Sequence, residues 1–133
     1  MIETYVLKKA GPVRVFLLDD HEIARRGVAD VLNAENDLEV VGDHGSTRGA
    51  LAAIQACSPD VAVLDVRLGD GSGIDVCRDI RSAHPDIGCL MLTSFSDDEA
   101  LLDAAMAGAA GYVLKQIRTN DLTESIRKVA DGV

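Results

Sequence analysis

The residues best suited to chemistry in this sequence each end a short apolar run. Asp19 and Asp20 end the first such run, Asp65 ends another, and Thr93 and Lys115 end two more. Carboxylates that are brought together repel one another unless a proton or a cation lies among them, and Mg²⁺ prefers such oxygen ligands. A carboxylate can also attack a phosphoryl group and form an aspartyl phosphate. These residue types predict magnesium-assisted phosphoryl transfer wherever the fold brings them together.

Phosphoryl transfer requires that the equatorial oxygens of the phosphoryl group be neutralised during the reaction. Mg²⁺ would take one of these oxygens, the Lys115 ammonium would take a second, and the Thr93 hydroxyl could donate a hydrogen bond to the third. Asp65 is the candidate nucleophile because it closes residues 61–64, a short and uniformly apolar run. Such a run is typical of a central strand that is buried on both faces.

Five apolar segments have the length and composition of strands, and a segment with helical spacing follows each of them. The predicted strands cover residues 13–18, 38–43, 61–64, 87–93 and 111–115. The predicted helices cover residues 21–34, 46–57, 74–83, 96–108 and 119–131, with Ser46 and Ser96 as caps. Five strand-then-helix units with short connections predict an α/β fold, in which a doubly wound parallel sheet carries helices on both faces.

The natural strand order for five such units is the flavodoxin-like (βα)5 order 2-1-3-4-5. Its switch point lies between the first and third strands, and ligands bind in the crevice outside the carboxyl ends of those strands. This order predicts that Asp19 and Asp20 lie beside Asp65. Thr93 and Lys115 would end the next two strands along the same edge of the sheet.

Composition limits the function classes. With 133 residues, 47% of them hydrophobic, the chain is long enough for one domain with a core of its own. A formal net charge of −9 argues against binding of nucleic acid through the chain's own electrostatics. No apolar run reaches the length of a membrane span and no signal peptide is evident, so we expect a cytoplasmic protein with no membrane contact.

The chain is expected to contain one domain and a short extension. Residues 1–12 fit no clear period and end on Gly-Pro, which predicts an N-terminal extension outside the core. Residues 13–133 then form the single predicted domain. Cys57, Cys77 and Cys89 lack the spacing of metal ligands and are expected to be reduced thiols.

The combined order and spacing of these residues resemble the receiver domains of bacterial two-component response regulators. The matching positions are Asp19, Asp20, Asp65, Leu68, Gly73, Thr93, Tyr112 and Lys115. The runs Asp-Asp-His-Glu-Ile-Ala-Arg-Arg-Gly and Ala-Gly-Ala-Ala-Gly-Tyr-Val-Leu-Lys are similar to the NarL/LuxR-type branch of that family. The run Val-Ala-Val-Leu-Asp-Val-Arg-Leu is similar to the dormancy regulators of the DevR (DosR) type.

The resemblance implies that Asp65 is the phosphoacceptor and receives its phosphoryl group from a sensor histidine kinase. It implies that Asp20, Asp65 and the backbone carbonyl of Arg67 ligate Mg²⁺, with Asp19 acting through water. The domain would catalyse only its own phosphorylation and slow dephosphorylation, and it would not be an enzyme in the metabolic sense.

The resemblance also implies a switch and an output. Thr93 and Tyr112 would form a switch pair, in which the hydroxyl moves toward the phosphoryl group and the ring follows into the vacated space. The resemblance further implies that the domain forms a homodimer, either through the first and fifth helices or through the fourth and fifth. DNA would be bound only through a C-terminal helix-turn-helix output domain that lies outside these residues and controls transcription.

Two positions depart from the family pattern. Gly69 stands where many members carry proline, so a more mobile loop is expected after Asp65. Gln116 follows Lys115 where a cis proline is frequent, so no cis bond is expected there.

Three other functions compete with that of a receiver domain. The main alternative is a pseudo-receiver that binds partners without phosphorylation, and the intact Asp, Thr and Lys set argues against it. A flavin or nucleotide binder would need a phosphate loop rich in glycine or in serine and threonine after the first strand, where acidic residues stand instead. A magnesium-dependent phosphatase would need a second acid two residues after the nucleophile, and Arg67 occupies that position.

Several other polar residues are expected to have structural roles only. His21, like the other two histidines, has no ligand-like spacing and is expected on the surface without a metal role. Arg25 and Arg26 are expected on a solvated helix face, and Asp70 is expected in a turn.

Overall fold

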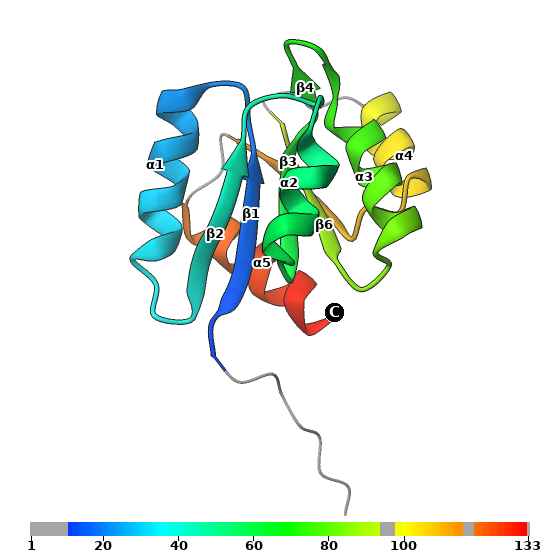
Figure 1. Ribbon diagram of the computed structural model, residues 1–133. Coiled ribbons are helices and arrows are strands. Elements are labelled where there is room, and N and C mark those ends of the chain that lie inside the picture. The colour runs from blue at the N-terminus through cyan, green and yellow to red at the C-terminus, as the bar shows by residue number, and fades with distance from the viewer. Residues whose placement is uncertain (1–10, 94–97, 116–118, 133) are drawn as a thin grey trace, which may run out of the picture.

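A five-stranded parallel sheet lies between two layers of helices (Figure 1). The computed structural model describes residues 11–93, 98–115 and 119–132. The strands of the main sheet are β1 (Val13–Leu18), β2 (Leu38–His44), β3 (Val61–Asp65), β6 (Gly88–Thr93) and β7 (Gly111–Leu114). The helices are α1 (Glu22–Asn33), α2 (Ala50–Cys57), α3 (Gly73–Ala83), α4 (Asp98–Met106) and α5 (Thr119–Asp131). Two further short strands, β4 (Arg67–Leu68) and β5 (Gly71–Ser72), pair with each other as an antiparallel hairpin.

The strands of the main sheet follow the order β2-β1-β3-β6-β7, and every neighbouring pair is parallel. Because β4 and β5 form a separate hairpin, this is the flavodoxin-like order 2-1-3-4-5 for the five main strands, as predicted. β1 and β3 are therefore neighbours, and the switch point of the sheet lies at their carboxyl ends.

The sheet separates two hydrophobic cores, because successive side chains of a strand point to opposite faces. On β3, Ala62 and Leu64 belong to one core, and Val61 and Val63 belong to the other. Helices α2, α3 and α4 contribute buried residues to the first core, and α1 and α5 contribute to the second. Every residue of β3 is buried, which confirms the predicted central strand.

Helix α2 begins at Ala50, so the predicted cap at Ser46 is wrong. Gly49, the residue before the helix, has a φ of 80°, a left-handed conformation that does not continue an α-helix. The Ser46 hydroxyl instead donates to the backbone carbonyl of Arg48 at 2.9 Å. The residues between β2 and α2 therefore form a loop.

The segment after β3 forms the β4–β5 hairpin, where the sequence predicts a loop. Asp70 lies in the turn of this hairpin, as predicted, and its carboxylate accepts hydrogen bonds from the backbone N–H groups of Thr47 at 2.9 Å and Arg48 at 3.2 Å. The bond from Thr47 is the main cause that lowers the pKa of Asp70. The hairpin is thereby fastened to the loop between β2 and α2.

The two described ends of the chain lie near each other at the edge of the sheet opposite to the carboxyl ends of the strands (Figure 1). Gly11, Pro12 and Gly132 line one hollow of about 890 Å³ at that edge. Predictions for residues 1–10, for the Ser96 cap and for the peptide bond before Gln116 lie outside the described residues.

The three cysteines are free, as expected, and Cys77 and Cys89 are buried. Within residues 11–93, 98–115 and 119–132, no helix combines the length and the apolar character needed to cross a membrane.

Candidate functional site

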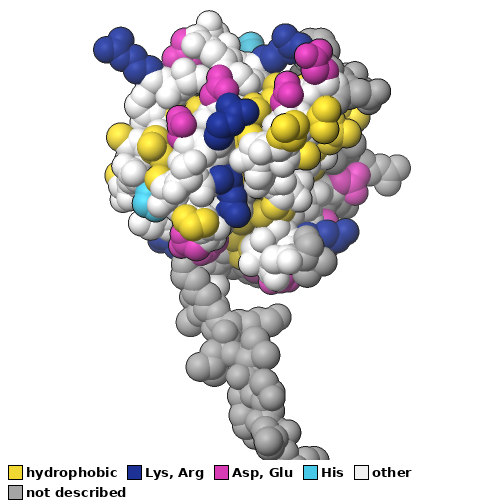
Figure 2. All heavy atoms as spheres, turned by 90° about the vertical axis from the view of Figure 1, so that its right-hand side faces the viewer, with side chains coloured by type: hydrophobic (Ala, Val, Ile, Leu, Met, Phe, Trp, Pro, Cys, Tyr) yellow, Lys and Arg dark blue, Asp and Glu magenta, His cyan; other side chains and the backbone are white. Residues whose placement is uncertain are grey.

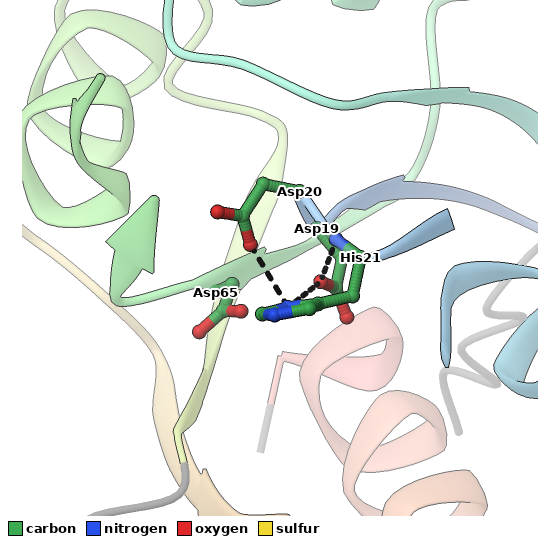
Figure 3. A group of neighbouring side chains, drawn as sticks. All are labelled: Asp19, Asp20, His21 and Asp65. Atoms are coloured by element: carbon green, nitrogen blue, oxygen red, sulfur yellow. Dashed lines mark hydrogen bonds and ion pairs between the residues drawn. The ribbon is translucent and has the colours of Figure 1, made fainter. Parts of the chain in front are cut away.

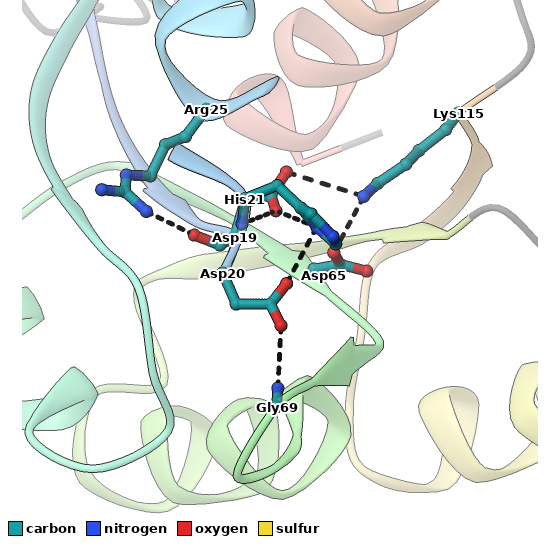
Figure 4. Close-up of polar contacts among 7 residues, drawn as sticks. All are labelled: Asp19, Asp20, His21, Arg25, Asp65, Gly69 and Lys115. Atoms are coloured by element: carbon teal, nitrogen blue, oxygen red, sulfur yellow. Dashed lines mark hydrogen bonds and ion pairs between the residues drawn. The ribbon is translucent and has the colours of Figure 1, made fainter. Parts of the chain in front are cut away.

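Asp19, Asp65 and Lys115 meet at the carboxyl edge of the sheet (Figure 4). Lys115 Nζ lies 2.8 Å from Asp65 Oδ2 and 3.6 Å from Asp19 Oδ2. Both aspartates are buried, with 6% of each residue exposed, whereas 24% of the Lys115 side chain is exposed. The structure thus brings three of the predicted site residues into contact.

The strand register explains why these side chains meet. β1 and β3 pair up to the residue before Asp19 and the residue before Asp65, so both carboxylates reach the same edge. Lys115 follows β7, where its backbone N–H donates to the carbonyl oxygen of Thr93 on β6. Because β6 lies between β3 and β7, the long lysine side chain extends across β6 to reach Asp65.

Burial and neighbouring charges shift the ionisation of this pair. Desolvation raises the pKa of Asp65 above its ordinary value of 3.8, while the hydrogen bond and the charge of Lys115 oppose that rise. Partial burial acts to lower the pKa of Lys115, but the hydrogen bond and charge of Asp65, with the charge of Asp19, raise it above its ordinary value of 10.5. Lys115 is therefore protonated at neutral pH and brings a permanent positive charge to the site.

Asp19, Asp20, His21 and Asp65 form a compact group of possible metal ligands, which we call the acidic group (Figure 3). One ligand atom from each residue lies within 4.8 Å of the others. The three carboxylates outnumber the single ammonium of Lys115, so the site has an excess of negative charge. A hard divalent cation with oxygen ligands would neutralise that excess, and the donor set therefore fits Mg²⁺.

His21 is the member of the acidic group that sequence reasoning misses. Its side chain is 73% exposed, as expected, yet its ring Nδ1 lies 3.1 Å from Asp20 Oδ1 and 3.5 Å from Asp19 Oδ1. Its backbone N–H also donates to Asp19 Oδ1 at 2.9 Å. His21 is the residue before α1, where the chain turns from strand to helix. Its position directly after two strand-end carboxylates is the signal that could have shown this placement.

Arg25 packs against the backbone of the acidic group, so the predicted solvated position is wrong for this residue. Only 18% of its side chain is exposed. Its Nη1 donates to the backbone carbonyl of Asp19 at 2.6 Å, and its Nε donates to Asp43 Oδ1 at 2.9 Å. Arg26, in contrast, is 77% exposed and pairs with Glu22 on the same helix, as the prediction requires.

Residues 15–127 match the family described as the response regulator receiver domain. The chain belongs to this family.

The receiver domain has curated relatives and solved neighbours. It is 54% identical over 120 residues to the DNA-binding transcriptional activator DevR/DosR of Mycobacterium tuberculosis, which covers 90% of this chain and 55% of that protein. It is also 34% identical over 120 residues to the response regulator protein VraR of Staphylococcus aureus. That match covers 90% of this chain and 57% of VraR. The signal receiver domain of NarL from Mycobacterium tuberculosis has a similar structure, with a TM-score of 0.87 and 31% identity over 92% of this chain and 99% of that one. The chain thus spans about half the length of the curated relatives it matches.

The remaining predicted site residues of the receiver domain lie on β4, β6 and β7. Thr93 ends β6 with 2% of the residue exposed, one position beyond the residue that pairs with Asp65. The backbone N–H of Arg67 donates to the Asp65 carboxylate, while the Arg67 side chain is exposed. Tyr112 is half-buried on β7 and packs against the core under α2, α3 and α4. The structure therefore groups Thr93 and Arg67 with Asp65 and places Tyr112 further back along its strand.

Gly73, the first residue of α3, lies directly behind Asp65 in the receiver domain. A Cβ added at Gly73 would be 1.9 Å from the Asp65 carbonyl oxygen, far inside van der Waals contact. The N–H of Gly73 donates to the carbonyl of Val66 at 2.9 Å. The start of α3 and the end of β3 therefore touch through their backbones.

Proposed function

We propose that this receiver domain accepts a phosphoryl group on Asp65 from a sensor histidine kinase and thereby switches the output of a longer response regulator. The observation that carries the proposal is the 2.8 Å contact between Lys115 Nζ and Asp65 Oδ2, beside carboxylates that can bind a cation. Desolvation makes an ion pair with a buried carboxylate an inefficient source of stability, so the presence of this part-buried pair at the end of a central strand favours a chemical role.

In the proposed reaction, an Asp65 oxygen attacks phosphorus while the bond from phosphorus to the donor nitrogen breaks. The Lys115 ammonium moves from the Asp65 carboxylate to a phosphoryl oxygen, and the Thr93 hydroxyl donates a hydrogen bond to another. Water later hydrolyses the aspartyl phosphate. The domain thus catalyses only its own phosphorylation and slow dephosphorylation.

Bound Mg²⁺ would supply positive charge to the phosphoryl oxygens. Asp20, Asp65 and the backbone carbonyl of Arg67 would hold it, and Asp19 would act through a water molecule. The convergence of the carboxylates within 4.8 Å supports this assignment.

The proposed switch couples phosphorylation to a surface. The Thr93 hydroxyl moves toward the phosphoryl group, the Tyr112 ring follows, and the face formed by α4, β7 and α5 changes. Phosphorylation shifts the population only as far as the phosphoryl group makes better contacts in the active arrangement. A homodimer then forms through α4 and α5, or through α1 and α5.

The proposed output is transcription in the bacterial cytoplasm. The relative DevR/DosR is named a DNA-binding transcriptional activator, and this chain matches about half of its length. We extend that role to a parent protein in which residues 13–133 form the receiver domain, residues 1–12 an extension, and a C-terminal helix-turn-helix domain binds DNA.

The test is intact mass measurement after incubation of the purified domain with acetyl phosphate, with and without Mg²⁺. We expect one Mg²⁺-dependent, base-labile phosphoryl adduct on the wild type and on the control Asp79→Asn, whose substituted residue is exposed on α3. The variant Asp65→Asn, which removes the nucleophile at nearly constant volume, should carry none.

Equal labelling of Asp65→Asn and the wild type would refute the site. No adduct on the wild type would favour the pseudo-receiver, which binds partners without phosphorylation.

A further inference from the structure

Asp20 is held at both of its carboxylate oxygens (Figure 4). The backbone N–H of Gly69 donates to Oδ2 at 2.9 Å, and the ring Nδ1 of His21 lies 3.1 Å from Oδ1. Oδ1 thus lies on the side of the acidic group, while Oδ2 faces the β4–β5 hairpin. The Asp20 side chain is 26% exposed, and these two polar contacts orient its carboxylate.

Gly69 is brought to Asp20 by an anchored hairpin. It lies in the turn between β4 and β5, and the next residue, Asp70, accepts the two hydrogen bonds from the loop between β2 and α2. The hairpin begins at Arg67, two residues after Asp65. One short backbone segment therefore links the candidate nucleophile to the donor that orients Asp20.

We propose that the Gly69 N–H is a positioning donor of the cation site, which fixes the Asp20 carboxylate with Oδ1 toward the bound cation and so couples cation binding to the β4–β5 hairpin. Because the cation site belongs to the proposed function, this role exists only if Asp20 binds the cation. Donors that orient a ligating carboxylate raise metal affinity, since the side chain is already ordered before the metal binds. The coupling is reciprocal, so a bound cation also strengthens the bond from Gly69 to Asp20.

Two substitutions at this position separate the N–H from the rest of the residue. Gly69→Pro removes the donor, and proline suits the second position of a turn that follows an extended residue. Gly69→Ala keeps the donor, and its Cβ would meet only Asp20 Oδ2, at an ordinary contact distance of 3.5 Å. The alanine variant is therefore the matched control for the proline variant.

The experiment is isothermal titration calorimetry with Mg²⁺ on the wild type and on Gly69→Pro, Gly69→Ala and Asp20→Ala. We expect Gly69→Ala to bind Mg²⁺ like the wild type and Gly69→Pro to bind about two- to tenfold more weakly, the net effect of one hydrogen bond. Equal affinity of the proline and alanine variants, or tighter binding by the proline variant, would overturn the positioning role.

The same titration separates this role from the proposed function. A wild type that binds no Mg²⁺, or an Asp20→Ala variant that binds it as tightly as the wild type, would refute the assigned cation site itself, and the positioning role with it. Wild-type binding that Asp20→Ala weakens, with no difference between the proline and alanine variants, would refute the positioning role alone.

A second measurement does not depend on the folding of the proline variant. Amide hydrogen exchange, followed by NMR, reports directly on the Gly69 N–H. We expect slower exchange in the Mg²⁺-free wild type than in Mg²⁺-free Asp20→Ala, and still slower exchange when Mg²⁺ is added to the wild type. Exchange that Asp20→Ala leaves unchanged, or that Mg²⁺ accelerates in the wild type, would contradict the coupling.

Discussion

Gly73 determines how closely helix α3 can approach β3, the strand that ends at the proposed phosphoacceptor Asp65. The requirement is one of space, because the conflict of an added Cβ is with the carbonyl oxygen of Asp65 at 1.9 Å. A backbone atom cannot rotate away as the end of a flexible side chain can. Any side chain at position 73 must therefore displace either α3 or the residue that carries the proposed chemistry.

Substitution of Gly73 by alanine should lower the free energy of unfolding by about 1–3 kcal/mol, the usual range for overpacking. Gly27→Ala is the matched control, because nothing lies within 4 Å of an added Cβ at this helical position. That variant should be more stable by about 0.5–1 kcal/mol, since alanine loses less backbone entropy than glycine in a helix. Urea unfolding of both variants measures the difference, and a Gly73→Ala variant as stable as the wild type would contradict the steric account.

At the scale of single residues, the sequence predicts the parts of the site that follow from strand ends. Asp19, Asp65 and Lys115 could be placed together because parallel strands bring their carboxyl ends to one edge. His21 and Arg25 could not, because their contacts depend on the turn into α1 and on the end of β2. Side-chain periodicity carries no information about such contacts between elements.

At the scale of elements, an ion pair fastens helix α5 to the turn before β2. Arg127 on α5 donates from Nε to Asp37 Oδ2 at 2.7 Å and from Nη2 to Oδ1 at 2.9 Å. Its Nη1 also donates to Glu124 at 2.8 Å. The hydrogen bond from Arg127 is the main cause that lowers the pKa of Asp37 below its ordinary value of 3.8. This contact connects a helix of the proposed switch face to the turn that leads into β2.

The ion pair should make stability depend on pH. A carboxyl whose pKa is lower in the folded state contributes stability above its unfolded value of 3.8 and loses that contribution as the pH falls through the folded value. Asp37→Asn should therefore be less stable than the wild type at neutral pH, by no more than about 1 kcal/mol because the pair is exposed. The difference in stability between the two proteins should vanish in acid, at pH values below the lowered pKa that Asp37 has in the folded state.

Urea unfolding at several pH values, with the exposed Asp79→Asn as the control, measures this dependence. A constant difference between Asp37→Asn and the wild type at all pH values would show that the ion pair is not its cause.

Elements with a clear hydrophobic period could be predicted with their bounds. Strand β1 and helix α5 begin and end where the sequence indicates. The start of α2 could not be predicted from Ser46, because the left-handed conformation of Gly49 depends on the loop around it. The β4–β5 hairpin was also missed, since two-residue strands lack enough residues for a recognisable alternation.

At the scale of the whole molecule, a negatively charged protein exposes apolar side chains on α4. Leu101, Leu102 and Met106 are 48%, 60% and 76% exposed, whereas the chain as a whole has a net charge of −9. Figure 2 views the side on which α4 lies and shows hydrophobic side chains gathered there among charged ones. Helix α1 also exposes Ile23 at 88% and Val31 at 36%. Among the described residues, α4 thus exposes three large apolar side chains and α1 two, which favours the face that includes α4.

Met106→Glu should weaken dimerisation of the phosphorylated domain by about tenfold or more, because a charge placed in an apolar interface must be desolvated. The residue is 76% exposed, so the stability of the monomer should change little. Ile23→Glu, at an 88% exposed position on α1, is the matched control. Sedimentation velocity with acetyl phosphate and Mg²⁺ measures the dimer, and weakening by Ile23→Glu alone would assign the interface to α1 and α5.

The position of the first and last described residues has a practical consequence. Gly11 and Gly132 lie at the edge opposite to the acidic group, around a shared hollow. A molecule immobilised on a sensor surface through a tether next to either of these residues therefore presents its carboxylates to the solution. A reporter protein attached there starts from the far side of the sheet, away from the proposed phosphoacceptor.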